Sequence, residues 1–286
     1  MPRATRRRRF LLMVANHAVL FAFSLAFLAP FVFMLLTSLM TDQQALSPKL
    51  WPDPFQWSNF VTVFQQIDLA RYTWNSFLYA GLSTLGVVLS CIPVAYAFSR
   101  LRWRGRGIIF LLVLSTLMLP NQVQTVPLYV MWAKWFPHWT GIEFIGTLRP
   151  LIIPSFFGDA FSIFLLRQFF LTIPSELCDS VRVDGGGDWQ VLTRVVVPLA
   201  KPGIAAIALF QFIYCWNDFY GPLVYLGENP NAQTLSLALS NFRGMHHVQW
   251  NLTMAATLIF MIPVVLIFFL AQRVFIEGVT LSGVKG

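Results

Sequence analysis

Long uncharged stretches alternate along the chain with short polar ones. Four stretches contain no Asp, Glu, Lys or Arg, namely 10–39, 72–99, 107–133 and 244–272. Two more, 151–170 and 203–226, are interrupted only by Asp159, Arg167 and Asp218. Each is long enough for a transmembrane helix, which needs about 20 mainly apolar residues. None shows the strict alternation of barrel strands. The pattern predicts an all-α membrane protein with six transmembrane helices.

The composition agrees with this prediction. Of the 286 residues, 57% are hydrophobic and 11% are charged, whereas a soluble domain carries about 25% charged residues. These values exclude an ordinary soluble enzyme, and they exclude a disordered chain, which would be poor in apolar residues. The net charge of +8 would indicate a nucleic-acid partner if the protein were soluble, so the placement of the charges has to be considered.

Basic residues are concentrated on one side of the predicted helices. If the N-terminus lies in the cytoplasm, fifteen of the 20 Lys and Arg residues face the cytoplasm. Positive charges favour that side of a membrane, so both termini are predicted to be cytoplasmic, and no nucleic acid is needed to explain the basic N-terminus. A signal peptide is the alternative, but the first apolar stretch is too long for one and no small-residue cleavage site follows it.

One cytoplasmic segment, 171–202, is longer than a connection between two spans requires. Its pattern predicts a short helix capped by Ser175, followed by a turn at the three glycines 185–187. A second helix would begin with Asp188 as its cap and end at Pro198. Such an element presents a compact surface to a partner. An amphipathic helix that lies on the membrane without a partner is the alternative.

At this segment the sequence resembles a known family. The cytoplasmic motif of binding-protein-dependent ABC importer permeases reads EAA, three residues, Gly, nine residues and I-x-L-P. The same spacing occurs here in Asp179-Ser180-Val181, Gly185 and the run from Val195 to Pro198, with DSV for EAA and valine for both Ile and Leu. Four further stretches resemble the carbohydrate-uptake subgroup, in particular the smaller permease subunit of the maltose transporter: AYAFSRLRWRGR (95–106), LMLPNQVQTVPLYV (117–130), WNDFYGPLVYL (216–226) and GVTLSGVKG (278–286).

The resemblance implies the fold of a type I ABC importer permease in the bacterial plasma (inner) membrane. Its partners would be a second permease subunit, two ATPases, an external solute-binding protein and the lipid bilayer. The chain itself would hold no cofactor, because ATP and Mg²⁺ would be bound by the ATPases. It would divide into an anchor helix with an external loop (1–72), a permease core (73–272) that includes the 171–202 segment, and a cytoplasmic tail (273–286). The residues expected to couple to the ATPases are Glu176, Asp179, Ser180, Val181, Arg182, Asp184, Gly185 and Pro198.

Polar residues within the spans are candidates for a solute pathway, because they are costly to place in lipid. The residues expected there are Asn121, Gln122, Gln124, Asn217 and Asp218. The first three lie between two prolines, where a broken helix can line a cavity; fixing the kink is their alternative role. Asp218 either contacts the solute or a gate, or hydrogen-bonds a helix end. Asp159 has a role in transport, or it pairs with Arg167 or with a helix of another subunit.

The sequence contains no motif of another functional class. The phosphate-binding pattern GxxxxGKS/T is absent, and no Ser/His/Asp set, HExxH motif or acidic pair indicates an enzyme. The three cysteines and four histidines do not form a metal site or a disulfide framework. An ion-coupled secondary transporter, acting without an ATPase, is the competing hypothesis. It would need ion-coupling charges in its spans, and only the acids Asp159 and Asp218 are available, so the permease hypothesis is favoured.

Overall fold

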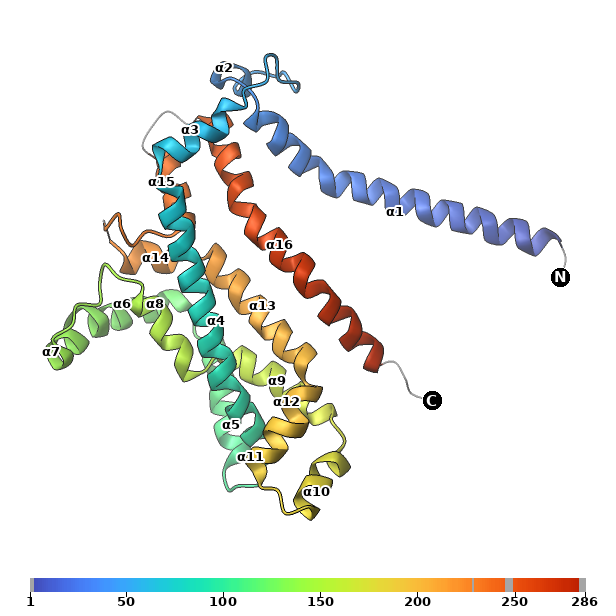
Figure 1. Cartoon of the computed structure of the whole chain (residues 1–286), viewed down its shortest axis with the longest axis vertical. Helices are drawn as coiled ribbons and strands as arrows, with labels where there is room; N and C mark the ends of the chain where they lie inside the picture. Colours follow the sequence, from blue (N-terminus) through green and yellow to red (C-terminus); the bar gives the residue numbers. More distant parts are fainter. Residues whose placement is uncertain (1–2, 228, 245–248, 283–286) are drawn as a thin grey trace. The chain divides into compact units, whose positions relative to one another are not determined.

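The computed structural model describes residues 3–227, 229–244 and 249–282, and the chain forms two compact units. Unit 1 comprises residues up to Asp68 together with Leu239–Met261, and unit 2 comprises Leu69–Ala238 together with the residues from Ile262 onward. The boundaries between the units fall within α15 (Leu235–Gly244) and within α16 (Trp250–Ser282). Figure 1 labels the helices along the chain. The division of the chain into 1–72, 73–272 and 273–286 stays a prediction, and residues 283–286 of the expected tail lie outside the described residues.

Unit 1 contains α1 (Arg3–Ser38), α2 (Asp42–Ala45), α3 (Ser58–Gln66) and the first part of α16. Its small core consists of Val63 and of Leu252, Ala255 and Ala256 from α16. The side-chain amide of Asn59 donates to the carbonyl oxygens of Ser38 and Met40, both at 2.8 Å, and so closes the turn after α1. These bonds satisfy carbonyl groups that the end of a helix leaves without partners.

Unit 2 is built around the long helix α4 (Leu69–Ser99), which contacts α9 (Ala160–Thr172) and α13 (Lys201–Asn217). Its core includes Ala95 of α4, Leu166 and Phe170 of α9, and Ile207 of α13. A Cβ atom on Gly203 would lie 2.6 Å from Cγ of Phe169, so α13 approaches α9 as closely as it does because this residue is glycine. Small residues at helix contacts are typical of membrane proteins, in which van der Waals packing holds the helices together.

The structure allows between four and six membrane spans, a range that includes the six predicted from the sequence. Among the described residues, four helical stretches are long and apolar enough to cross a membrane: Phe10–Ser38, Leu69–Ser99, Arg149–Thr172 and Trp250–Phe269. Two further pairs of helices are bent, by 100° between Arg106–Met118 and Gln122–Thr140 and by 76° between Asp188–Leu199 and Lys201–Asn217. Counting each bent pair as one span brings the number to at most six. The second pair then includes residues 188–199, which the sequence places in the cytoplasmic segment 171–202, so only its second helix corresponds to the predicted fifth span.

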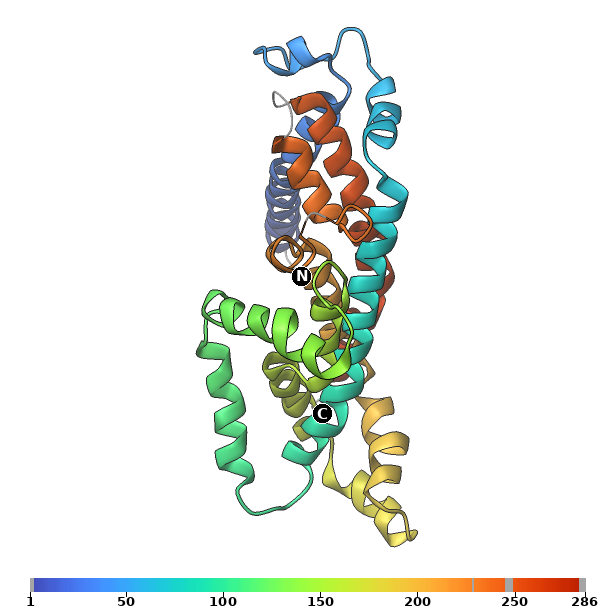
Figure 2. The ribbon, with the colours of Figure 1, turned by 90° about the vertical axis from the view of Figure 1, so that its left-hand side faces the viewer.

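The third and fifth predicted spans are broken rather than straight. The third consists of α5 (Arg106–Ser115), η1 (Thr116–Met118), α6 (Asn121–Val130), η2 (Met131–Trp135) and α7 (Phe136–Thr140). Figure 2 shows α5 and α6 meeting at a steep angle. Pro120 lies at this bend in an extended conformation (ψ 134°). In the fifth, α13 ends at Asn217 and a separate helix, α14 (Tyr220–Tyr225), follows. The fourth span joins α8 (Arg149–Ile152), η3 (Ile153–Phe157) and α9.

Candidate functional site

The 171–202 segment folds into two short helices joined by a glycine turn, as predicted, but its helix ends differ from the prediction. The first helix, α10 (Ser175–Val183), is followed by α11 (Asp188–Val191), the π-helical turn η4 (Leu192–Val196) and α12 (Val197–Leu199). Pro174 and Gly187 occupy the two N-cap positions, and neither cap makes a side-chain hydrogen bond. The expectation that Ser175 and Asp188 are N-caps is therefore wrong. Each of them is the first residue of its helix, one position after the N-cap.

Pro198 does not end the second helix. It lies inside a continuous helical run, because α12 follows η4 with no break in the backbone and the N–H of Val197 bonds the carbonyl of Leu192. The wider turn η4 precedes it, and the helix continues to Leu199. The change of direction comes after Leu199, where α13 begins at Lys201.

Two of the three glycines are required by the turn that closes α10. The N–H of Gly186 donates to the carbonyl of Val181 at 2.8 Å, and the N–H of Gly185 donates to the carbonyl of Arg182 at 3.0 Å. This pair of bonds is a Schellman motif, whose penultimate position takes a left-handed conformation. Gly185 has that conformation, with φ +83°. The predicted break after α10 is thus present, and it is held by backbone hydrogen bonds.

The residues expected to couple to the ATPases lie together, with one exception. Glu176, Asp179, Ser180, Val181 and Arg182 belong to α10, Asp184 is its C-cap and Gly185 follows directly. Pro198 lies apart from them in α12. Apolar side chains around the glycine turn are strongly exposed, with Val183 87% and Trp189 71% accessible. Cys178, in contrast, is buried in the unit 2 core. The glycine turn therefore carries exposed apolar side chains, while α10 is packed into the core through Cys178.

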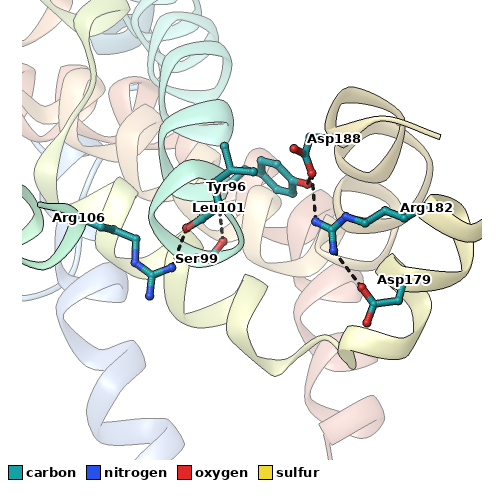
Figure 3. A network of polar contacts seen from close by, with 7 residues as sticks. All are labelled: Tyr96, Ser99, Leu101, Arg106, Asp179, Arg182 and Asp188. Atoms are coloured by element: carbon teal, nitrogen blue, oxygen red, sulfur yellow. Dashed lines mark hydrogen bonds and ion pairs between the residues drawn. The ribbon is translucent and has the colours of Figure 1, made fainter. Parts of the chain in front are cut away.

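A polar network connects α10 to the end of α4 (Figure 3). The guanidinium group of Arg182 donates from Nη1 to Oδ1 of Asp179 at 2.9 Å and from Nη2 to Oδ1 of Asp188 at 3.0 Å. The hydroxyl of Tyr96, on α4, donates to the same Oδ1 atom of Asp188 at 3.1 Å. The hydrogen bond to Asp188, and then that to Asp179, raises the pKa of Arg182 above its ordinary value, so this side chain stays charged.

A pocket of about 720 Å³ lies beside this network. Its lining combines α10 residues such as Asp179 and Arg182 with arginines of the short basic turn after α4, namely Arg100, Arg102 and Arg106. The guanidinium of Arg106 donates to the carbonyl of Leu101 at 2.8 Å, as Figure 3 shows. Sequence reasoning identified this turn only as a source of positive charge and did not connect it, or Tyr96, to α10. The two segments are some 80 residues apart in the sequence, and no local pattern reports such a contact.

A second candidate region lies inside unit 2, where the broken helices leave space. Two neighbouring cavities, of about 770 and 290 Å³, share the lining residues Gln124, Pro154 and Tyr214. Gln122 and Asp218 line the smaller cavity. Asn217 instead donates from Nδ2 to the carbonyl of Ile213 in its own helix at 2.8 Å. The side chain of Asn121 lies outside the described residues. The structure thus brings together three of the five residues expected in a pathway.

The two acids in the predicted spans have structural partners. Oδ2 of Asp218 accepts from the hydroxyl of Tyr79 at 2.8 Å, and Oδ1 accepts from the N–H of Gly221 at 3.1 Å. The carboxylate therefore holds the break between α13 and α14, which is the helix-end role of the two alternatives. Asp159 is the N-cap of α9, and its Oδ2 accepts from the N–H of Ser162 at 2.7 Å. Its carboxylate also lines the larger cavity.

Arg167 does not use Asp159 as its partner. Its Nε donates to the carbonyl of Phe98 at 3.1 Å, and its guanidinium lies 4.4 Å from the ring centre of Phe110. Both contacts lie near the end of α4 and the start of α5, so the pairing with Asp159 considered from the sequence is wrong.

Aromatic side chains dominate the smaller cavity, and the sequence did not single them out. They are Tyr79, Trp132, Tyr214, Tyr220 and Tyr225. The chain contains 28 Phe, 10 Trp and 7 Tyr residues, so composition alone cannot show which of them leave the lipid-facing surface. No Lys, Arg or His residue lines either cavity within the described part of the chain. The lining can therefore offer stacking surfaces, amides, hydroxyls and two carboxylates to a solute.

Comparison with known proteins places this architecture in a family. Residues 74–280 match the model of the family described as binding-protein-dependent transport system inner membrane component. The arabinooligosaccharides transport system permease protein AraQ of Halalkalibacterium halodurans is 32% identical over 240 residues, which is 82% of this chain and 81% of the relative. The lactose transport system permease protein LacG of Rhizobium radiobacter is 28% identical over 98% of this chain and 99% of its own length.

The fold is also similar to solved structures. A chain in the crystal structure of a bacterial ABC transporter involved in the import of the acidic polysaccharide alginate has a TM-score of 0.77 at 21% identity. That similarity covers 96% of this chain and 98% of the other. A chain of the MetNI methionine ABC transporter has a TM-score of 0.53 and covers 73% of this chain. The all-α fold predicted from the sequence is thus that of ABC importer permeases. Since the family match covers more than half of its residues, the chain belongs to the binding-protein-dependent transport system inner membrane components.

Proposed function

We propose that the chain is one of two permease subunits of an ATP-driven importer for carbohydrates in a bacterial plasma membrane. The second permease would complete the pathway, and two cytoplasmic ATPases would bind the ATP and Mg²⁺, one docking on α10 and the other on the corresponding segment of the second permease. A solute-binding protein would deliver the solute at the outer face. The observation that carries this proposal is the helix–glycine turn–helix of the 171–202 segment, in a chain of this transport family.

The shape of that segment supports docking of a partner. Val183 and Trp189 are apolar and largely exposed at its tip. The exposed Asp184 directly follows Val183 as the C-cap of α10, and the exposed Glu176 lies in the first turn of the same helix. Exposed apolar side chains gathered in one place mark interaction sites. The π-helical turn and the Schellman motif fix the direction in which the tip points. A partner that pushes on α10 would therefore move a rigid element and not a loose loop.

The cavities in unit 2 support a carbohydrate as the solute. Sugar rings have apolar faces that stack on aromatic side chains, and their hydroxyl groups exchange hydrogen bonds with amides. Tyr214 and Gln124 line both cavities, and Trp132 and Gln122 line the smaller one. Relatives of this chain are named for arabinooligosaccharides and for lactose. Because the only charged residues in the described linings are the acids Asp159 and Asp218, we propose that the solute is uncharged.

Purification of the tagged chain in a mild detergent tests the assembly. We expect an ATPase, a second permease and a solute-binding protein in the same complex, identified by their masses. In proteoliposomes, uptake of a labelled sugar should require ATP and should persist when an ionophore collapses the proton gradient. Uptake without ATP by the isolated chain would contradict the proposal and favour an ion-coupled secondary transporter.

A substitution at the glycine turn tests the docking role. Gly185→Val forces a β-branched side chain into a left-handed conformation, which such residues almost never adopt. ATP-dependent uptake should fall sharply while the amount of chain in the membrane is maintained. Unchanged uptake with normal membrane levels would show that the ATPases do not need the geometry of this turn.

A further inference from the structure

The polar network between α10 and α4 is not needed to hold the segment together. Packing does that, since Cys178 of α10 and Val191, Leu192 and Val196 of the second helix are buried in the same core as Ala95 of α4. The side chains of Arg182, Asp179 and Asp188 are 42%, 61% and 53% exposed. Ion pairs this exposed contribute little to stability. Their arrangement therefore calls for a different explanation.

The network has a fixed end and a movable end. Tyr96 is 4% exposed and belongs to the core, so its hydroxyl is held at a constant place on α4. Arg182 lies in the last turn of α10, directly before the glycine turn. Oδ1 of Asp188 accepts from both residues, at 3.1 and 3.0 Å. One carboxylate oxygen of Asp188 therefore joins Tyr96 of α4 to Arg182 of α10 (Figure 3).

The same network also ties α10 to α11. Asp188 is the first residue of α11, and Arg182 spans the glycine turn to reach it. Asp179, one turn earlier in α10, accepts from the other arm of the Arg182 guanidinium. The side chain of Arg182 is consequently held at both arms: Asp179 fixes its orientation on α10, and Asp188 joins it to α11.

We propose that Tyr96, Asp188 and Arg182 form a link that sets the angle of α10 against α4 and passes movement of α10 to that helix. The link rests on the proposed function, because the movement would come from an ATPase docked on α10. The three are positioning residues: they touch neither solute nor ATP. Without the link, docking and ATP hydrolysis continue, but α4 follows α10 less completely and fewer solute molecules cross for each ATP consumed.

The complete importer in proteoliposomes provides the test, with a labelled sugar that the wild-type complex takes up, chosen from a panel that includes lactose and arabino-oligosaccharides. Two quantities are measured together, the rate of ATP hydrolysis and the rate of sugar uptake. Tyr96→Phe, Asp188→Asn and Arg182→Met should each lower uptake per ATP about fivefold or more, the size expected when a hydrogen bond to a charged group is lost. A structural defect would instead lower the two rates in parallel.

A double variant distinguishes a link from separate contacts. If Tyr96 and Asp188 act through one hydrogen bond, Tyr96→Phe combined with Asp188→Asn should lose no more than the worse single variant. Arg104→Met is the matched control, since it removes an exposed arginine of the nearby basic turn, and its uptake per ATP should equal that of the wild type. Tyr96→Phe removes a single hydroxyl, so it keeps the test valid if a charge variant fails to assemble.

Three outcomes would overturn the link. Unchanged uptake per ATP in Tyr96→Phe and Asp188→Asn, with a loss in Arg182→Met alone, would mean that Arg182 contacts an ATPase directly. Multiplying effects in the double variant would mean that the two residues act independently. Absence of ATP-dependent uptake by the wild-type complex that contains all its subunits would refute the proposed function itself, and the link with it.

Discussion

The three consecutive glycines after α10 have different surroundings, which predict three different results for replacement by alanine. At Gly185 the cost is in the backbone: φ is +83° and no heavy atom lies within 4 Å of an added Cβ. A left-handed conformation costs an L-residue about 1–2 kcal/mol. At Gly187, φ is −82° and the added Cβ again meets nothing within 4 Å. Alanine there restricts the unfolded chain, which favours the turn by about 0.4–1 kcal/mol, but Gly187 is the N-cap of α11 and alanine is a poorer N-cap than glycine, so the two effects should nearly cancel.

Gly186 is limited by space. An added Cβ would lie 2.5 Å from Cγ1 of Val181 and 2.8 Å from its carbonyl oxygen. That oxygen accepts the N–H of Gly186, so it cannot move away without breaking the turn. Overpacking of this kind costs about 1–3 kcal/mol. A cost of about 2 kcal/mol changes the ratio of formed to unformed turn about 30-fold, so Gly186→Ala should be the most harmful of the three.

The assay is ATP-dependent sugar uptake, corrected for the amount of each variant in the membrane. Uptake should be lowest for Gly186→Ala, reduced for Gly185→Ala and equal to the wild type for Gly187→Ala. The third variant is the control, since it changes composition in the same way but meets no clash. If Gly187→Ala impairs uptake as much as Gly186→Ala, the reasoning from turn geometry is refuted, and a contact of the glycines with a partner must replace it.

Three further predictions concern other parts of the chain. Gly203→Ala places a Cβ 2.6 Å from Cγ of Phe169. It should destabilise the detergent-solubilised complex by about 1–3 kcal/mol, measured as a lower melting temperature. An unchanged melting temperature would show that the Phe169 ring rotates away freely. Asn59→Ala leaves the buried carbonyl of Ser38 without its side-chain donor and leaves that of Met40 with Asn251 Nδ2 at 3.2 Å. It should cost about 1–3 kcal/mol, measured as faster proteolysis within unit 1. Equal cleavage would contradict the role of this side chain. Gln124→Ala should raise the KM for sugar uptake several-fold, because the amide lines both cavities. Asn217→Ala, whose amide faces its own helix, should leave the KM unchanged, and equal effects of the two variants would argue against the cavity as the solute site.

Much of the fold follows from where charge is absent along the chain. Stretches without charge predicted six spans, and the structure contains four long apolar helices and two bent pairs. The bend near Pro120 could be anticipated, since proline disturbs a helix. The break at Asp218 could not be anticipated, because the Asp218 carboxylate is held by a hydrogen bond from the hydroxyl of Tyr79, a residue 139 positions away. Local patterns carry no information on such distant partners.

The 171–202 segment shows the same limit at a smaller scale. The three glycines correctly predicted the position of the turn, because the positive φ that the turn requires falls on Gly185 itself and does not depend on distant residues. The caps were wrong by one residue, since Ser and Asp are common both at the cap and in the first turn of a helix. Asp188 is not a cap because its carboxylate is bound by Tyr96 and Arg182. Where tertiary hydrogen bonds compete with a cap, the sequence alone does not show which partner is chosen.

The distribution of cysteine offers a way to observe the two units separately. All three cysteines, Cys91, Cys178 and Cys215, are free and buried, and all belong to unit 2. A thiol-reactive dye therefore has little to label in the folded chain, and its fluorescence on heating reports the opening of unit 2. Unit 1 remains silent in the same experiment. Thiol labelling is thus a selective probe of the unit that contains α10 and the cavities. A Val183→Cys variant, at an exposed position, would add one accessible thiol without removal of any native cysteine.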